Sequence, residues 1–389
     1  MKTKTALALT ALSLALAAPP TEAQTQGVSK TEILVGTIQD LSGPLAGIGK
    51  AVRNGMLLRI EEVNEQGGIH GRKLKLAVED SGYDPKRAVL AAQKLVNQDE
   101  IFAMVGHVGS AHNLAAMPLQ FEKNVVNLFP ISGSREMYEP LHKLKYSNTV
   151  PYYDQIRNTL PRLAKEKGAK KICTIYQDDD FGAEIRSAAE AAVKTMGMEL
   201  VEKTNFKRGA TDFSSQVARM KAAGCDMVVL GTVIRETVGT IAESRRTGFN
   251  PTFLGTIGAY NDLIHRLGGK AMDGLYATMT YQIPYADDAS QAIRTWSGKY
   301  KAKFNEDPTE SSVMGYLMIE TFVRGAQKAG PNLNTETFVA AMDSLVIPPS
   351  IFGDPESSFT PTRHLGNNLC RLSQIQDGKW KVISDYVKP

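Results

Sequence analysis

Cysteine, excess charge and long apolar runs are all scarce in this chain, and each absence excludes a class of protein. Only three cysteines occur in 389 residues, at positions 173, 225 and 370, and this odd, low number does not build a disulfide scaffold. Cys173 and Cys225 lie in the apolar runs KICTIY and CDMVVL, so we interpret them as small buried hydrophobic residues. No cysteine and histidine cluster has metal-ligand spacing, and we expect neither a metal nor a cofactor.

The net charge is too small to indicate a nucleic-acid partner. The chain carries 45 lysines and arginines against 41 aspartates and glutamates, a formal charge of +4. No basic stripe with interleaved aromatic residues accompanies that charge. Two common catalytic or nucleotide-binding motifs, G-x-S-x-G and G-x-G-x-x-G, are also missing. Their absence argues against a hydrolase nucleophile elbow and against a phosphate-binding loop. We therefore expect no catalytic residues.

The one long apolar run lies at the N-terminus. Positive charge at residues 1–4 precedes an apolar stretch at 6–18, which is too short to span a bilayer as a stable helix. Small residues near position 23 resemble a signal-peptidase site, so residues 1–23 are predicted to be a signal peptide of an exported, periplasmic protein. A membrane anchor or a buried helix is the alternative. The remaining length suggests two domains, because one core rarely grows past roughly 250–300 residues.

The stretch 101–130 organises the rest of the chain. An apolar run with β character at 101–105 is followed by a glycine-punctuated loop, a stretch of helix formers and a second apolar run. Strand, loop, helix and strand in this order form the unit of a parallel α/β sheet. A helix start presents unpaired N–H groups and the positive end of the helix dipole, which together hold a small anion. Val108, Gly109 and Ser110 are therefore expected to form half of a ligand cleft.

A second loop of the same kind follows the next strand. Residues 129–134 read FPISGS and leave the strand through small, hydroxyl-rich positions. Ligands bind at the carboxyl ends of strands in open parallel sheets. Ser132, Gly133 and Ser134 are therefore expected at the same edge as Ser110.

The alternation of strands and helices repeats after residue 151, which predicts two similar α/β lobes with doubly wound parallel sheets. Helical stretches follow at about 290–345, and a strong hairpin turn stands at Asp377 and Gly378. If the helices return to the first lobe, the chain crosses three times, and three crossings form a hinge that permits closure. We expect a first lobe of residues 24–150 and 282–350, and a second lobe of residues 151–281 and 351–389.

Six stretches carry a resemblance to a known family: ILVGTIQDLSGPLAGIG (33–49), NEQGGIHG (64–71), DPKRAVLAAQKLV (84–96), VGHVGS (105–110), TDFSSQVARM (211–220) and FLGTIG (253–258). In these stretches the chain resembles type I periplasmic solute-binding proteins of the branched-chain (hydrophobic) amino acid ABC transporter family. The resemblance implies two lobes with three hinge crossovers and a small-molecule ligand between them. It also implies a membrane permease and an ATPase as partners of a monomeric protein.

The resemblance implies which residues hold the ligand's carboxylate. In the family the loop after the third strand uses a serine hydroxyl and backbone N–H, and Ser110 matches that serine. The loop after the fourth strand adds backbone groups and a hydroxyl, which match the positions 132–134. Four or five neutral donors can hold a carboxylate without a buried counter-charge.

The amine side of the family's site does not match. Its acid for the α-ammonium aligns with Ile257, its tyrosine in the QDDDFG loop with Phe181, and its first-loop aromatic residue with Ile48. An ammonium without a partner in a closed cleft is strongly unfavourable. We therefore expect a carboxylate ligand with an apolar or aromatic body and no α-ammonium. Further contacts are expected from Tyr152, Tyr153, Tyr260 and, for a second anionic group, Arg235.

Other interpretations stay open at this point. Glu236 or Asp180 could take an ammonium, and the ligand would then be a branched-chain or other hydrophobic amino acid. A ligand sensor with the same fold is a further functional class. The serines could merely cap helices, and His107 is interpreted as a structural hydrogen-bonding residue.

Overall fold

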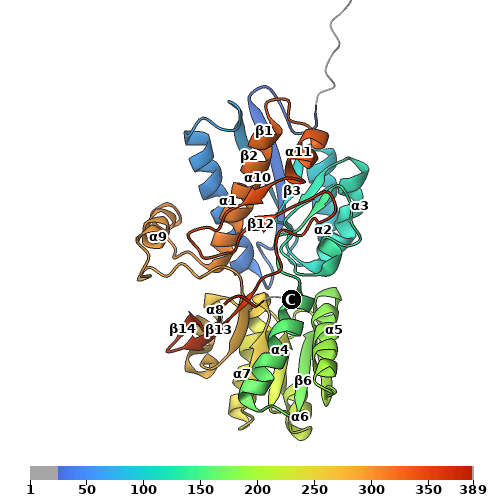
Figure 1. The fold of residues 1–389 in the computed structure, drawn as a ribbon, viewed down its shortest axis with the longest axis vertical. Helices are drawn as coiled ribbons and strands as arrows, with labels where there is room; N and C mark the ends of the chain where they lie inside the picture. The colour runs from blue at the N-terminus through green and yellow to red at the C-terminus, as the bar shows by residue number, and fades with distance from the viewer. Residues whose placement is uncertain (1–24, 388–389) are drawn as a thin grey trace, which may run out of the picture.

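The computed structural model describes residues 25–387, so the expected signal peptide lies outside the described residues. Two α/β lobes follow one another along the long axis, with blue and cyan segments in the upper lobe and green and yellow segments in the lower (Figure 1). The first lobe has a parallel five-stranded sheet in the order β2-β1-β3-β4-β5. Its strands and early helices are β1 (Glu32–Gln39), α1 (Ala46–Glu65), β2 (Lys73–Asp80), α2 (Pro85–Asn97), β3 (Ala103–Val105), α3 (Ser110–Glu122), β4 (Val126–Leu128) and β5 (Lys145–Tyr146).

The second lobe repeats this strand order and adds a hairpin at one edge. Its sheet has the order β14-β13-β10-β9-β8-β6-β7 and is parallel from β10 to β7. The hairpin turns at Asp377 and Gly378, whose φ angles of 53° and 71° give the left-handed backbone that a two-residue turn needs. The elements are α4 (Tyr152–Lys167), β6 (Ile172–Gln177), α5 (Asp180–Thr195), β7 (Glu202–Phe206), α6 (Ser214–Ala222), β8 (Met227–Gly231), α7 (Ile234–Arg246), β9 (Thr252–Gly255), α8 (Asp262–Gly268), β10 (Tyr276–Met279), β13 (Arg371–Gln376) and β14 (Lys379–Val382).

The chain crosses between the lobes after β5, after β10 and before β13, so the expected three-crossover hinge is present. Between the last two crossings lie α9 (Gln291–Phe304), α10 (Glu310–Ala329), α11 (Thr335–Met342), β11 (Val346–Ile347) and β12 (Ser357–Ser358). The orange helix α10 lies along the blue helix α1 in the first lobe (Figure 1).

Two glycines allow this contact between α1 and α10. A Cβ at Gly55 of α1 would lie 1.9 Å from the carbonyl oxygen of Ser312, and one at Gly315 of α10 would lie 2.1 Å from that of Val52. Atoms cannot approach so closely, so each helix presents a glycine where the partner's backbone comes nearest. The helix that begins at Glu310 is thereby fixed against the first lobe.

Residues 357–366 pack against the first lobe, whereas Gly353 before them accepts hydrogen bonds from Arg371 and Tyr386. Strand β12 pairs with β11, Leu365 forms a β-bridge with Ser147, and Phe359 packs in the core beneath the first sheet. We therefore propose that the first lobe extends to about residue 366, and that the final segment of the second lobe begins after it.

The interpretation of two cysteines as separate hydrophobic residues is wrong. Cys173 and Cys225 form a disulfide, with their Cα atoms 5.9 Å apart. Strands β6 and β8 are neighbours in the sheet although β7 separates them in sequence, and their pairing brings Ile172 opposite Met227. The two cysteines thus meet at the start of adjacent strands. Cys370 is a buried free thiol.

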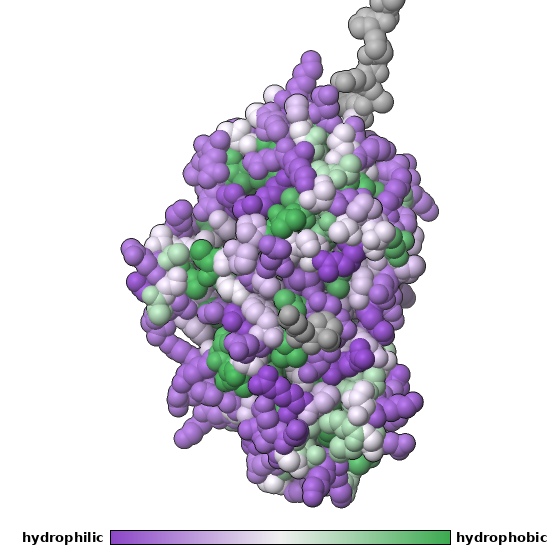
Figure 2. All heavy atoms as spheres, viewed as in Figure 1, coloured by the Kyte–Doolittle hydropathy of each residue, from purple (hydrophilic) through white to green (hydrophobic). Residues whose placement is uncertain are grey.

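The described surface is mainly hydrophilic, and in the face shown in Figure 2 apolar residues gather only in small, separate patches. Among residues 25–387, no helix combines the length and the apolar character needed to cross a membrane. In the same part of the chain no group of histidine, cysteine and acidic side chains is arranged to hold a metal ion.

Candidate ligand-binding site

A cavity of about 60 Å³ lies between the lobes, where the carboxyl ends of both parallel sheets face each other. The first-lobe wall consists of the starts of α1 and α10 and of the loops after β2, β3, β4 and β5. Loops after β6, β8 and β9 supply the opposite wall. The lining residues are Leu45, Ile48, Tyr83, Val108, Gly109, Ser110, Ile131, Ser132, Thr149, Tyr152, Phe181, Val233, Ile257, Gly258, Tyr260, Asn261, Glu310, Ser311 and Met314.

Two serine hydroxyls form one polar group in this wall. The Oγ atoms of Ser110 and Ser132 lie 2.7 Å apart, and both side chains are buried. Ser110 is the first residue of α3, after Gly109 at a φ of 95°, so the unpaired N–H groups and positive dipole of the helix start lie beside the hydroxyls. This combination of neutral donors suits a carboxylate.

Four of the expected contact residues, namely Ser134, Gly133, Arg235 and Tyr153, do not line the cavity. Ser134 donates its hydroxyl to a carboxylate oxygen of Glu136 at 2.5 Å, and its N–H donates to Ser132 Oγ at 3.1 Å. Gly133 accepts a backbone hydrogen bond from Tyr152. Arg235 is exposed on the first turn of α7. The side chain of Ser134 and the backbone of Gly133 therefore bind other residues of the protein, and Arg235 faces solvent.

The apolar and aromatic part of the wall contains the remaining expected residues. Tyr152 and Phe181 pack edge to face, with ring centroids 5.1 Å apart, and Ile48, Val108 and Ile257 complete an apolar surface. The hydroxyl of Tyr260, which also lines the cavity, accepts a hydrogen bond from the N–H of Ile283 at 3.3 Å. Tyr153 lies outside the wall, with the guanidinium of Arg135 4.0 Å above its ring.

Sequence reasoning missed a buried acid in the wall. Glu310 is 3% exposed; its Oε1 accepts hydrogen bonds from Asn261 Nδ2 at 2.7 Å and from the hydroxyl of Ser311. Its Oε2 is buried and has no hydrogen-bond partner among the described residues. Burial, with a smaller contribution from the Asp262 carboxylate, raises the pKa of Glu310 to about 8. The only sequence signal was a glutamate at a helix start, which is an ordinary surface feature.

The acids that the sequence offered as ammonium partners lie elsewhere. Glu236 is buried in the first turn of α7, where burial raises its pKa, but it does not line the cavity. Asp180 is exposed at the start of α5. Other lining residues that sequence reasoning did not single out as contacts are Leu45, Tyr83, Ile131, Thr149, Val233, Gly258, Asn261, Ser311 and Met314.

His107 is buried in the loop between β3 and α3, and its burial predicts that the stability of the protein depends on pH. Its ring nitrogens have no partner in the described chain, and burial lowers its pKa from 6.5 to about 3. The unfolded chain therefore binds a proton below pH 6.5 that the folded protein does not, so stability falls as the pH falls. From pH 7.5 to 5.5 this residue alone should cost about 1.4 kcal/mol. Urea unfolding at both pH values measures this cost. Between pH 7.5 and 5.5 the unfolding free energy of wild type should fall by about 1.4 kcal/mol more than that of His107→Gln. An equal loss in the variant would contradict the assignment.

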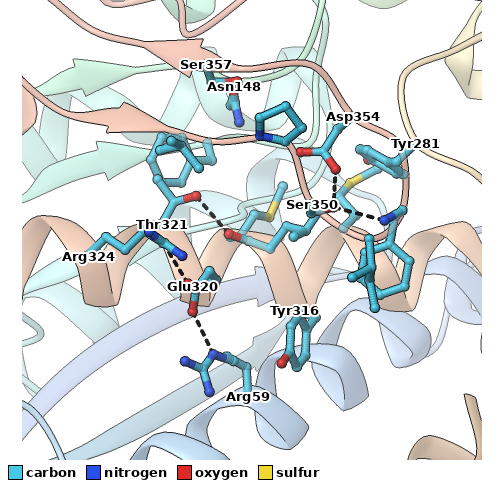
Figure 3. Close-up of a pocket in the computed structure, with 18 of the residues that line it drawn as sticks. Arg59, Asn148, Tyr281, Tyr316, Glu320, Thr321, Arg324, Ser350, Asp354 and Ser357 are labelled. Atoms are coloured by element: carbon cyan, nitrogen blue, oxygen red, sulfur yellow. Dashed lines mark hydrogen bonds and ion pairs between the residues drawn. The ribbon is translucent and has the colours of Figure 1, made fainter. Parts of the chain in front are cut away.

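A larger cavity of about 650 Å³ lies beside the first, against α1 and α10 and under residues 347–354 (Figure 3). Charged side chains of its wall pair with one another: Glu320 binds Arg59 at 2.8 Å and Arg324 at 2.6 Å. Thr149 and Met314 line both cavities. We favour the smaller cavity as the ligand site because loops from the strand ends of both lobes meet there.

Comparisons with known proteins agree with this architecture. Residues 32–379 match the family described as periplasmic binding protein. The leucine-, isoleucine-, valine-, threonine-, and alanine-binding protein of Pseudomonas aeruginosa is 27% identical over 293 residues, which cover 75% of this chain and 76% of that protein. The Leu/Ile/Val/Thr-binding protein of Salmonella typhimurium is 29% identical over 247 residues, covering 64% and 67% of the two chains.

Two solved structures show the same fold. A fatty acid ABC transporter substrate-binding protein from Thermomonospora curvata superposes with a TM-score of 0.85 at 22% identity, covering 94% of this chain and 95% of that one. A solute-binding protein of an ABC transporter from R. palustris, in complex with benzoate, gives a TM-score of 0.81 at 18% identity, covering 92% and 98%.

Proposed function

Because the chain belongs to the periplasmic binding protein family, we propose that it is the substrate-binding component of an ABC importer that captures a small carboxylate between its lobes. The observation that carries this proposal is the pair of hydroxyls of Ser110 and Ser132, 2.7 Å apart at the start of α3 in the wall of the cavity. Neutral donors at a helix start suit a carboxylate, and the apolar wall suits an apolar or aromatic body.

The names of related proteins support a carboxylate ligand, but they do not agree on the rest of the ligand molecule. Relatives are named for leucine, isoleucine, valine and threonine, and structures of the same fold for a fatty acid and for benzoate. All of these compounds carry a carboxylate. The second candidate is therefore a hydrophobic amino acid, which the names of the curated relatives favour.

The partners and compartment follow from the same premise. We propose that the protein acts as a monomer in the periplasm, delivers its ligand to a permease and an ATPase, and catalyses no reaction. The disulfide between Cys173 and Cys225 supports an oxidising compartment, where such bonds persist.

A thermal-shift panel tests the proposal. Refolded, ligand-stripped protein would be heated with branched-chain amino acids, their deaminated acids, benzoate-type and phenylpropanoid acids, dicarboxylates and amides. A ligand at about 100 times its dissociation constant adds about 2.7 kcal/mol of stability, so the melting temperature should rise by a few degrees. Binders should be recovered chemically unchanged.

The panel separates the two candidate ligand classes. Stabilisation by acids and not by amino acids supports the first candidate, and stabilisation by leucine, isoleucine or valine supports the second. The proposal of carboxylate capture would be contradicted if only amides stabilised the protein, or if no carboxylate of the panel raised its melting temperature. Turnover of a bound compound would contradict the transport role.

A further inference from the structure

The cavity wall contains two separate polar groups. One is the serine group of Ser110 and Ser132, and the other consists of Glu310, Asn261 and Ser311. No hydrogen bond joins the two groups within residues 25–387, and the lining between them is largely apolar. A ligand that forms hydrogen bonds with both polar groups of the wall therefore needs a second polar group besides its carboxylate.

The hydrogen bonds around Glu310 indicate where its proton lies. Oε1 accepts from both Asn261 and Ser311, whereas Oε2 is buried without a partner among the described residues. When the acid is neutral, its proton belongs on Oε2, because Oε1 already faces two donors. Oε2 is then a hydroxyl donor directed at no protein acceptor.

The surroundings of Glu310 keep the acid neutral near pH 7. No lysine, arginine or histidine forms an ion pair with it in the described chain. The titratable groups that face it are Asp262 of α8, which is itself paired with Arg266 at 3.1 Å, and the tyrosines 260, 281 and 285. Burial raises the pKa values of all three tyrosines, so they stay uncharged near pH 8.

We propose that neutral Glu310 recognises an uncharged oxygen of the ligand, such as that of a hydroxyl or carbonyl group. The hydroxyl at Oε2 would donate a hydrogen bond to this oxygen. This inference rests on the proposed function and narrows the substrate class to carboxylates that carry such a group on their apolar body. A ligand that lacks the group leaves a buried donor unsatisfied, which disfavours its binding. An ionised Glu310 would instead repel a carboxylate ligand held in the same small cavity.

Matched probes isolate this contact. One series is benzoate, 4-(hydroxymethyl)benzoate and 4-(aminomethyl)benzoate, and the other is hexanoate, 6-hydroxyhexanoate and 6-aminohexanoate. Calorimetry at pH 7 in buffers with different ionisation enthalpies measures affinity and proton exchange together. The proteins are wild type, Glu310→Gln, Glu310→Leu and Glu236→Gln. Glu236 is the matched control, because it is also a buried acid in the first turn of a helix with an unpartnered Oε2, but it does not line the cavity.

The hydroxyl probe of at least one series should bind wild type about tenfold or more tightly than the unsubstituted probe, with proton exchange close to zero. Glu310→Leu should abolish that preference, and Glu236→Gln should retain it. At pH 9 wild type should bind the hydroxyl probe about tenfold more weakly than at pH 7, because Glu310 ionises near pH 8. Glu310→Gln stays neutral, so its affinity should not fall with pH.

Three results would overturn the inference while leaving carboxylate capture intact. The ammonium probe could bind best with release of nearly one proton, which would make Glu310 a partner of a cation. The hydroxyl and unsubstituted probes could bind equally in both series. A stronger ligand from the wider panel could bind Glu310→Leu and wild type alike. If no carboxylate binds the folded wild-type protein at all, the proposed function fails together with the inference.

Discussion

Replacing Ser110 and Ser132 together by alanine is expected to weaken carboxylate binding at least a hundredfold. Their hydroxyls form one polar group 2.7 Å across at the start of α3, and both are buried. A hydrogen bond to a charged group contributes about 1.5–3 kcal/mol, so two lost bonds correspond to roughly 10²–10⁴ in the dissociation constant. Calorimetry with the best ligand of the thermal-shift panel measures this loss, and the single variants show how far the two hydroxyls act together.

Ser134→Ala is the matched control on the same loop. Its hydroxyl donates to Glu136 and not into the cavity, while its N–H contact to Ser132 survives the substitution. We expect its affinity to change less than about threefold, within the range of surface substitutions. An equal loss in Ser134→Ala and Ser132→Ala would show that the whole 132–134 loop binds the ligand, as the family resemblance implies.

Removing the disulfide should produce the largest loss of stability. Cys173 and Cys225 are separated by 52 residues. For a loop of this length the chain-entropy account gives about 4 kcal/mol at 25 °C. The melting temperature of the Cys173→Ala/Cys225→Ala protein should therefore lie on the order of 10 °C below that of wild type. Scanning calorimetry with and without a thiol reductant measures the effect.

The reductant supplies the control for this experiment. It should lower the melting temperature of wild type and leave the double variant unchanged, since Cys370 is buried and unpaired in both. A reductant effect on the double variant, or a wild-type protein that melts at the same temperature as the variant, would contradict a stabilising bond.

Local signals in the sequence predicted most of the fold. Asp84 caps α2 by accepting the N–H of Arg87 at 2.9 Å, with Pro85 in the first helical position, as the Asp-Pro pair indicates. The turn at Asp377 and Gly378 joins β13 and β14 as predicted. Helix caps and two-residue turns depend on neighbouring residues alone, so they can be read without knowing the tertiary structure.

The features that sequence reasoning missed depend on residues that are far apart in the chain. The partner of Cys173 follows from the strand order of a sheet, and the place of Glu310 in the cavity wall depends on Asn261, which donates a hydrogen bond to it from the other lobe. Ser132 and Ser134 differ by only two positions, yet one hydroxyl faces the cavity and the other faces Glu136. No periodicity distinguishes them, because loop conformation decides where each hydroxyl points.

The contact between α1 and α10 also sets an order of assembly. Gly55 and Gly315 meet across about 260 residues of intervening chain, whereas the parallel strands β6 to β10 all lie between residues 172 and 279. Contacts of such long sequence separation form late, because a large loop must close before they contribute. The second lobe can therefore fold while the apolar side of α1 is still uncovered. The first lobe begins the chain, yet its core closes only when α10 returns to it, and the cleft exists only after that return.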